Sequence, residues 1–555
     1  MHPPTNSTDS AATRQLPAEA PCAPAARKWV LANSILASGM VFIDGTVVNV
    51  ALPALQREFD ATVAQAQWVI EAYALLLTAL LLLGGALGDR YGRRRVFALG
   101  VALFGIASVL CALAAGIGQL IWARALQGLG GALLVPGSLA LISASFPESI
   151  RGKAIGTWSG WTAITAAVGP VLGGFLIEHA SWRHAFLLNL PFALAVLWLT
   201  FRYVPESRGA AVGAGADTGA GADTRPRLDW PGALLVSLAL GCLVYGLIES
   251  SARGWLDAGV TAALALAPLA FAAFVAVELR HPAPLLPLQL FRSRDFSGAN
   301  LLTLLLYAAL GGMMFFLPLN LIQVQGYSAT AAGAALIPFI VIMFTLSGWA
   351  GGLADRFGAR APLVIGPLVS AGGFALFAVP GVGGSYWSTF FPAMLVLGFG
   401  MTVTVAPLTT TVMNALDPIH AGLASGINNA VSRAAGLLAI ALLGIVMHGA
   451  FNQALDRHLR GAVLAPAVLA QIDAQRGKLG AIEVPASILP RAGHERQAVR
   501  HAVAASFVDG FRRVMGICAL LAAGSALGAW MLVGGRRALE PPSRDSLPDS
   551  SDSNT

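Results

Sequence analysis

Charged residues are scarce in this chain. Only 11% of the 555 residues are Asp, Glu, Lys or Arg, whereas 56% are hydrophobic, and a typical soluble domain carries about 25% charged residues. Because so few charges cannot cover the surface of a soluble protein of this size, an ordinary soluble fold is excluded. Apolar runs of about 18 residues or more recur along most of the chain, and each can cross a hydrocarbon core of about 30 Å. The sequence therefore predicts a membrane protein in the lipid bilayer.

Cysteine and known catalytic motifs are also scarce or missing. The four cysteines, Cys22, Cys111, Cys242 and Cys518, lie far apart and form no CxxC or Cys/His cluster, so neither a disulfide framework nor a metal site is indicated. The chain has no G-x-x-x-x-G-K-[ST] loop for ATP, no HExxH motif and no serine-hydrolase elbow. We therefore expect no enzyme activity and no cofactor.

Hydrophobic runs predict fourteen transmembrane helices in an all-α fold. Their expected ranges are 29–54, 66–88, 96–116, 119–144, 153–178, 184–203, 230–250, 258–279, 298–323, 329–353, 361–380, 387–414, 422–447 and 508–534. An even number of spans places both termini on the same side of the membrane. With the N-terminus inside, the inner segments hold 21 Lys and Arg residues and the short outer loops hold three. The positive-inside rule then predicts cytoplasmic termini and explains the net charge of +7 without a nucleic-acid partner.

Composition divides the chain into six parts. Two disordered cytoplasmic tails, a Gly/Ala-rich cytoplasmic linker, two additional helices and two six-helix bundles are expected. In chain order these are 1–28 (tail), 29–203 (first bundle), 204–229 (linker), 230–280 (additional helices), 281–535 (second bundle, with a long outer loop at 448–507) and 536–555 (tail). The outer loop contains short apolar stretches that could form amphipathic helices on the membrane surface.

An internal repeat supports duplicated halves. The segment GALGDRYG, beginning at Gly85, matches GGLADRFG, beginning at Gly351, in the pattern G-x-L-x-D-R-aromatic-G. Each copy ends an apolar helix at a cytoplasmic turn, where glycine permits a tight turn and close helix approach. We expect a gating role for Gly85, Asp89, Arg90, Gly92, Arg93, Asp355, Arg356 and Gly358.

These motifs resemble the major facilitator superfamily, and in particular its fourteen-span drug:proton antiporters of the EmrB/QacA type. The first repeat resembles the superfamily's signature between helices 2 and 3. Further resemblances follow in the expected order: DGTVVNVALP from Asp44, R-x-x-Q-G-x-G from Arg124, G-P-x-x-G-G from Gly169, W-R with Phe186, Asn189 and Pro191, LDWPG from Leu228, and PLLPLQLFR from Pro284. Together they cover about residues 29–535.

The resemblance implies two pseudo-symmetric six-helix bundles plus two extra helices. It also implies proton-coupled efflux of amphipathic drugs, with cationic compounds expected, by alternating access in a plasma (bacterial inner) membrane. The proton gradient would supply the energy. A dedicated exporter of one antibiotic or metabolite is an alternative, and a non-transporting membrane sensor is a second. In a Gram-negative source, a periplasmic adaptor and an outer-membrane channel would be further partners.

Three ionisable residues inside the predicted helices are candidates for proton coupling. An ionisable side chain in a bilayer is energetically unfavourable and is by default a functional candidate. Asp44 lies near the middle of the first helix, where it either carries a proton or serves as a structural carboxylate. Arg124 and Glu71 lie at similar depth and are expected to pair, as a coupling element or as a structural ion pair.

Other residues carry open interpretations. Gly169, Pro170, Gly173 and Gly174 form the antiporter motif of the family, where they restrain proton leak or simply kink the helix. Arg433 near a helix end either contributes to function or extends its head group to the membrane surface. The expected substrate-cavity residues are Asn49, Trp158, Trp161, Met313, Phe316 and Asn320, although aromatic, Met and Asn side chains in membrane helices also serve packing.

Overall fold

The computed structural model describes residues 23–208, 228–282, 284–416, 421–460, 464–485, 487–489 and 493–534. Fourteen helices in these ranges are long and apolar enough to span a membrane, which confirms the expected number. The described residues contain helices and no strand. Both predicted tails beyond these ranges, and most of the predicted linker, lie outside the described residues.

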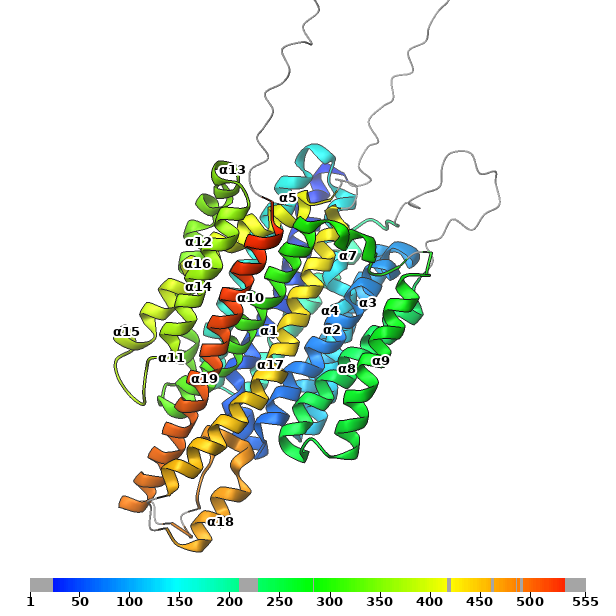
Figure 1. The fold of residues 1–555 in the computed structure, drawn as a ribbon. Coiled ribbons are helices and arrows are strands. Elements are labelled where there is room, and N and C mark those ends of the chain that lie inside the picture. The colour runs from blue at the N-terminus through cyan, green and yellow to red at the C-terminus, as the bar shows by residue number, and fades with distance from the viewer. Residues whose placement is uncertain are drawn as a thin grey trace, which may run out of the picture.

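The first half of the chain forms a bundle of six spans, the last of which is built from two helices (Figure 1). Its helices are α1 (Pro24–Phe59), α2 (Val63–Tyr91), α3 (Arg93–Ala112), α4 (Ile117–Ser145), α5 (Glu148–His179), α6 (Trp182–Leu187) and α7 (Asn189–Tyr203). Two additional helices follow, α8 (Trp230–Arg253) and α9 (Ala258–Glu278).

The second half repeats the six-span bundle with more interruptions. Its elements are η1 (Leu288–Arg292), α10 (Arg294–Leu319), η2 (Asn320–Val324), α11 (Ala329–Ala334), α12 (Ile337–Gly351), α13 (Leu353–Phe357), α14 (Arg360–Phe377), α15 (Tyr386–Thr389), α16 (Phe391–Asn414), α17 (Ala421–Leu459), α18 (Pro466–Ala474), η4 (Arg476–Ala481) and α19 (His494–Leu532). The helices α17 and α19 extend well past the expected ends at 447 and 508, so much of the predicted outer loop is helical.

Local sequence signals set the helix ends. Thr62 caps α2 by accepting a hydrogen bond from the Gln65 backbone N–H, and the Gln65 side chain accepts one from the Thr62 backbone N–H. This reciprocal arrangement satisfies two backbone donors at the helix start. Between α2 and α3 the chain turns at Gly92, whose φ of 111° is readily adopted by glycine alone.

Within each half, glycines allow helices to approach closely. A Cβ atom on Gly84 of α2 would lie 2.0 Å from the Ala132 carbonyl oxygen of α4, and one on Gly128 of α4 would lie 2.3 Å from the Tyr73 carbonyl oxygen. In the second half, a Cβ on Gly366 of α14 would lie 2.2 Å from Thr404 Oγ1 of α16. Small residues at such crossings allow the backbone contact that drives helix association in a bilayer.

The additional helices α8 and α9 lie against the junction of the two halves. Helix α8 packs on α2 of the first half and on α17 of the second, and α9 packs on α8 (Figure 1). Val244, Leu247 and Ile248 of α8 share an apolar cluster with Leu437 and Ala441 of α17. The extra pair therefore covers one side of the seam between the bundles.

The two ends of the molecule differ. We call the end where α1 begins and α19 ends the terminal face, and the opposite end, where α18 lies, the far face (Figure 1). Toward the far face, a Cβ on Gly174 of α5 would lie 2.3 Å from the Ala329 carbonyl oxygen, and one on Gly333 of α11 would lie 2.1 Å from the Pro170 carbonyl oxygen. These distances show that the halves are in tight contact there.

Toward the terminal face, α5 is apart from α12, the helix that continues the span of α11. Gly152, Gly156 and Gly160 of α5 have no neighbouring atom within 4 Å of an added Cβ, and the same holds for Gly348 and Gly351 of α12. The structure is therefore closed at the far face and open toward the terminal face.

Candidate functional site

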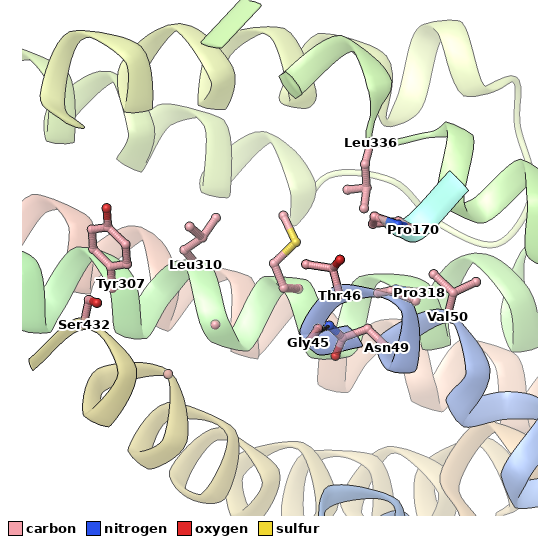
Figure 2. Close-up of a pocket in the computed structure, with 13 residues that line it drawn as sticks. Gly45, Thr46, Asn49, Val50, Pro170, Tyr307, Leu310, Pro318, Leu336 and Ser432 are labelled. Atoms are coloured by element: carbon pink, nitrogen blue, oxygen red, sulfur yellow. Dashed lines mark hydrogen bonds between the residues drawn. The ribbon is translucent and has the colours of Figure 1, made fainter. Parts of the chain in front are cut away.

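A cavity of about 340 Å³ lies between the halves at the middle of the bundle (Figure 2). We call it the central cavity. Its lining residues come from α1, α5, α10, α17 and the turn before α12: Gly45, Thr46, Asn49, Val50, Pro170, Tyr307, Leu310, Gly311, Met314, Pro318, Leu336, Ser432 and Gly436. Its size and mainly apolar lining suit a small organic molecule.

One face of α10 forms a wall of the central cavity. Tyr307, Leu310, Met314 and Pro318 follow one another at three- or four-residue spacing, which places them on one side of the helix. Figure 2 shows Tyr307 and Ser432 at one end of the cavity and Pro170, Pro318 and Val50 at the other. The first end faces the terminal side, since α10 begins there.

A second cavity of about 380 Å³ lies nearer the far face and shares Val50 with the first. Its lining includes Arg57, Glu178 and Tyr327 and is more polar. The Glu178 carboxylate accepts a hydrogen bond of 3.1 Å from the Thr330 backbone N–H, which joins α5 to α11 across the seam. Burial raises the pKa of the Tyr327 phenol above its usual value.

Asp44 is the centre of a buried polar network inside the first half. One carboxylate oxygen is 2.5 Å from Arg124 Nη1. The other accepts hydrogen bonds from Gln127 Nε2 at 2.8 Å and Asn189 Nδ2 at 2.9 Å. Both donors also contact Ser108 Oγ, at 2.9 and 3.2 Å. Because these partners of Asp44 come from two helices other than α1, the charge on Asp44 holds α1 to α4 and α7.

Arg124 is satisfied from several sides. Its Nε donates to the Val69 carbonyl oxygen at 3.0 Å, and its guanidinium lies 4.2 Å from the centre of the Tyr73 ring. Both Asp44 and Arg124 are 1% exposed. An ion pair buried so fully is stable only because its remaining hydrogen bonds are made.

The predicted Glu71–Arg124 pair is wrong for this conformation, because Arg124 pairs with Asp44. Glu71 is fully buried, and neither of its carboxylate oxygens has a hydrogen-bond partner among the described residues. It lies one helical turn from Gln67, whose side chain donates to the Ile440 carbonyl oxygen of α17 at 3.0 Å. Residues four apart share a helix face, so Glu71 lies on the face of α2 that meets α17.

The predicted antiporter motif on α5 lies at the contact between the halves. A Cβ on Gly169 would lie 2.0 Å from Thr46 Oγ1, and one on Gly173 would lie 2.8 Å from Val47 Cγ1, both on α1. Gly174 and Pro170 meet α11 as described above. The motif therefore allows α5 to touch α1 of its own half and α11 of the other half along one stretch.

The first copy of the repeated motif, for which a gating role is predicted, lies at the terminal end of α2. Asp89 accepts a hydrogen bond from Arg93 Nε at 2.8 Å. Arg90 lies 5.6 Å from the Tyr91 ring centre. Glu206, beyond the end of α7, accepts a 3.0 Å hydrogen bond from the Arg94 backbone N–H. A Cβ on Gly92 would lie 2.7 Å from that carboxylate.

The second copy of the motif is built differently. Gly352 separates α12 from the short helix α13, whereas α2 continues through its copy of the motif to Tyr91. Gly358 has a φ of 75° and ends α13. Arg356 is exposed. The side chain of Asp355 lies outside the part of the chain that the structure describes.

Of the expected substrate-cavity residues, Asn49 lines the central cavity. Met313, Phe316 and Asn320 do not line it and are 0–1% exposed; their neighbour Met314 lines it instead. Trp158 donates to Ser38 Oγ at 3.0 Å within the first half. Trp161 is 52% exposed on the open part of α5.

Reasoning from the sequence did not assign a role to four residues that the structure brings into these sites. Gln127 and Asn189 belong to the motifs quoted for the family, which is a usable signal. Ser108 and Glu206 carry no such signal. Glu206 falls in the expected linker, yet it accepts a hydrogen bond from the Arg94 backbone N–H beside the first copy of the repeated motif.

Residues 34–440 match the family model described as Major Facilitator Superfamily. The chain belongs to this superfamily. It is 33% identical over 499 residues to the Tetracenomycin C resistance and export protein of Streptomyces glaucescens, covering 88% of this chain and 89% of that protein. It is 34% identical over 511 residues to multidrug resistance protein Stp of Mycobacterium tuberculosis (strain CDC 1551 / Oshkosh), covering 90% and 89%.

A third relative, puromycin resistance protein pur8 of Streptomyces alboniger, is 37% identical over 438 residues, or 78% of this chain and 84% of its own length. Because these relatives are named for resistance and export, the chain is an efflux transporter and not an enzyme. The predicted resemblance to drug-exporting members of the superfamily is thereby confirmed.

Solved structures agree on the fold. A bacterial homolog of the human lysosomal transporter Spinster, in an inward-facing and unoccupied conformation, aligns with a TM-score of 0.63 at 17% identity and covers 92% of this chain and 98% of its own. A D-xylose-proton symporter aligns with a TM-score of 0.56 at 16% identity, covering 92% and 98%.

Proposed function

We propose that this transporter exports amphipathic antibiotics or related drugs in exchange for protons, with Asp44 as the proton site. The observation that carries the proposal is the position of Asp44. Its carboxylate is buried with Arg124, while the next residues of α1, Gly45 and Thr46, line the central cavity. A change in the charge of Asp44 therefore acts on the helix that touches the transported molecule.

Protonation of Asp44 supplies the driving step. A neutral carboxyl can no longer balance Arg124, and an uncompensated buried cation is strongly unfavourable. Rearrangement of α1 relieves this, because α1 is held to α4 through that pair and to α7 through the Asn189–Asp44 hydrogen bond. The same helix contacts α5 at Gly169 and Gly173, beside the far-face seam, so its movement would loosen the closed end and open the cavity to the far face.

Orientation follows from the basic residues. Arg93, Arg94 and Arg95 lie at the terminal face, and the positive-inside rule assigns that face to the cytoplasm. The open end of this conformation would then take up substrate from the cytoplasm or inner leaflet of a bacterial plasma membrane. In a Gram-negative source the far face would meet a periplasmic adaptor and outer-membrane channel.

Two narrower alternatives stay open to test. The chain could export one dedicated antibiotic or metabolite, as the name of the tetracenomycin C relative describes for that protein. It could also act as a sensor without transport. Competition among chemically unrelated compounds separates multidrug from dedicated export, and proton movement triggered by substrate excludes the sensor.

The test is transport by the purified protein in proteoliposomes with an imposed proton gradient. We expect a panel of aromatic drugs to trigger proton flux in the wild type, and we expect Asp44→Asn to reduce it to the level of protein-free liposomes. The substitution keeps the shape of the side chain and removes the titratable group.

The matched control is Asp456→Asn, which neutralises an exposed carboxylate near the far end of α17. This variant should transport normally. Full proton-coupled export by Asp44→Asn, in a protein that elutes and unfolds like the wild type, would refute the role of Asp44.

A further inference from the structure

The central cavity contains no acidic side chain. Among its thirteen lining residues, none is charged, and its polar groups are those of Thr46, Asn49, Tyr307 and Ser432. The nearest acid on α1, Asp44, is turned into the first half and already holds Arg124, Gln127 and Asn189. Nothing in the lining selects for a positively charged molecule.

A cation lies beside this cavity. Arg433 of α17 directly follows Ser432 and lies less than one turn before Gly436, both of which line the cavity. Its guanidinium is 5.8 Å from the centre of the Phe42 ring on α1. Phe42 in turn accepts the Thr46 hydroxyl hydrogen bond through its carbonyl oxygen at 3.0 Å. Arg433 thus lies where α1 and α17 face each other at the terminal-side end of the cavity.

The position of Arg433 is too deep for its charge to be placed at the membrane surface. It lies twelve residues into α17, or about 18 Å along the helix from Ala421, at the level of the central cavity that Ser432 and Gly436 line. The side chain is half-buried. Among the described residues no carboxylate lies within ion-pair distance of its guanidinium. An unpaired cation at such depth is strongly unfavourable and marks a functional site.

Two groups could balance this charge. Glu71 is the buried acid on the neighbouring face of α2, and it makes no ion pair with Arg433 in this conformation. The other is a ligand in the cavity. The cavity adjoins Arg433 and has apolar walls with an aromatic ring, Tyr307, at the same end.

We propose that the central cavity binds aromatic compounds that carry a negative charge, such as a carboxylate or phenolate, with Arg433 as their counter-ion. The proposal rests on the export function and specifies its substrate class. An Arg–carboxylate hydrogen bond is charge-assisted and forms a planar two-point contact, while the ring system of the ligand occupies the apolar walls.

The test compares three dyes on one scaffold: 7-diethylaminocoumarin-3-carboxylate, its uncharged 3-carboxamide and a 3-carboxamide bearing a trimethylammonium group. Binding to the purified full-length protein is followed by fluorescence polarisation, and proton-driven transport is measured in proteoliposomes. We expect the wild type to bind the carboxylate roughly tenfold more tightly than the carboxamide, as a charged hydrogen bond predicts. Arg433→Gln should lose this preference and still bind and transport the carboxamide, and Arg433→Lys should keep part of the preference.

Arg57→Gln serves as the matched control, because Arg57 lines the second cavity and not the central one; it should retain the preference. Equal binding of the carboxylate and the carboxamide by the wild type, or tighter binding of the trimethylammonium dye, would overturn the proposal. If Arg433→Gln lost transport of all three dyes while its binding of each dye was unchanged, the proposal would also be overturned. Arg433 would then be the counter-ion of Glu71 and not of the ligand. Failure of the export function itself appears separately, as absence of proton-driven transport of any dye by the wild type.

Discussion

At the scale of single residues, Asp44 and Arg124 neutralise each other in the interior of the first half. Removing one partner leaves the other charge buried and unpaired. We therefore expect Arg124→Gln to destabilise the protein by about 3–5 kcal/mol, measured as a lower midpoint of thermal unfolding in detergent.

The double variant Asp44→Asn/Arg124→Gln separates stability from coupling. It removes both charges, so its unfolding midpoint should return most of the way to the wild-type value, while proton-driven transport stays absent. A double variant as unstable as Arg124→Gln alone would show that the pair is not the source of the stability. A double variant that transports in response to the proton gradient would remove these residues from the coupling mechanism.

The residues of the Asp44 network show which parts of the candidate site could be predicted from the sequence. Asp44 and Arg124 stand out because ionisable groups are rare in apolar helices, and this signal does not depend on knowing the fold. Their pairing was not predicted, because the similar depth of Glu71 and Arg124 in the membrane indicated a Glu71–Arg124 pair instead. Only the rotation of each helix about its axis decides which side chains meet, and the apolar pattern of a membrane helix barely encodes that rotation. Ser108 was missed for the same reason.

At the scale of helices, the closed far face depends on glycine. Because a Cβ on Gly333 would lie 2.1 Å from the Pro170 carbonyl oxygen, Gly333→Ala should separate α11 from α5 and destabilise this conformation by about 1–3 kcal/mol, as overpacking does elsewhere. We expect slower transport and greater labelling, by a membrane-impermeant maleimide, of a single cysteine introduced at Ile177 in the second cavity.

Gly160→Ala is the matched control on the open part of α5. Nothing lies within 4 Å of a Cβ there, so this variant should transport and label like the wild type. If Gly333→Ala behaves like Gly160→Ala, the α5–α11 contact does not determine which face is closed.

Helix number and order were predictable because fourteen apolar runs are separated by polar turns. The breaks inside the second half were not. The expected helix 329–353 is two helices, α11 and α12, and the second gating motif forms the separate helix α13. Hydropathy is insensitive to such breaks, because the residues on both sides are equally apolar. The tight seam at Gly174 and Gly333 also required the structure, since the two glycines lie in different halves.

At the scale of the whole molecule, both halves are connected at the far face by polar groups as well as by glycine. Gln323 Nε2 donates to Gln56 Oε1 at 2.8 Å. Lys478 of η4 forms an ion pair with Asp60 at the turn between α1 and α2. The segment between α17 and α19 therefore connects the second half to the first, a role that its expected place on the membrane surface did not suggest.

Reversing one charge in the Lys478–Asp60 pair should shift the balance between the closed and open far face. Asp60 is mostly exposed, and exposed ion pairs contribute at most about 1 kcal/mol. A free-energy change of about 1 kcal/mol hardly alters the stability of the protein against unfolding. It does change the ratio of the far-closed to the far-open conformation by a factor of about five. We expect Lys478→Glu to increase the far-open population by up to this factor, measured by electron–electron distances between spin labels at Thr62 and Gln471.

The charge swap Asp60→Lys/Lys478→Asp should restore the wild-type distribution, and high salt should reduce the difference between wild type and Lys478→Glu. An unchanged distribution in Lys478→Glu would mean that the helix seam alone keeps the far face closed, and the loop would then have no part in the transport cycle.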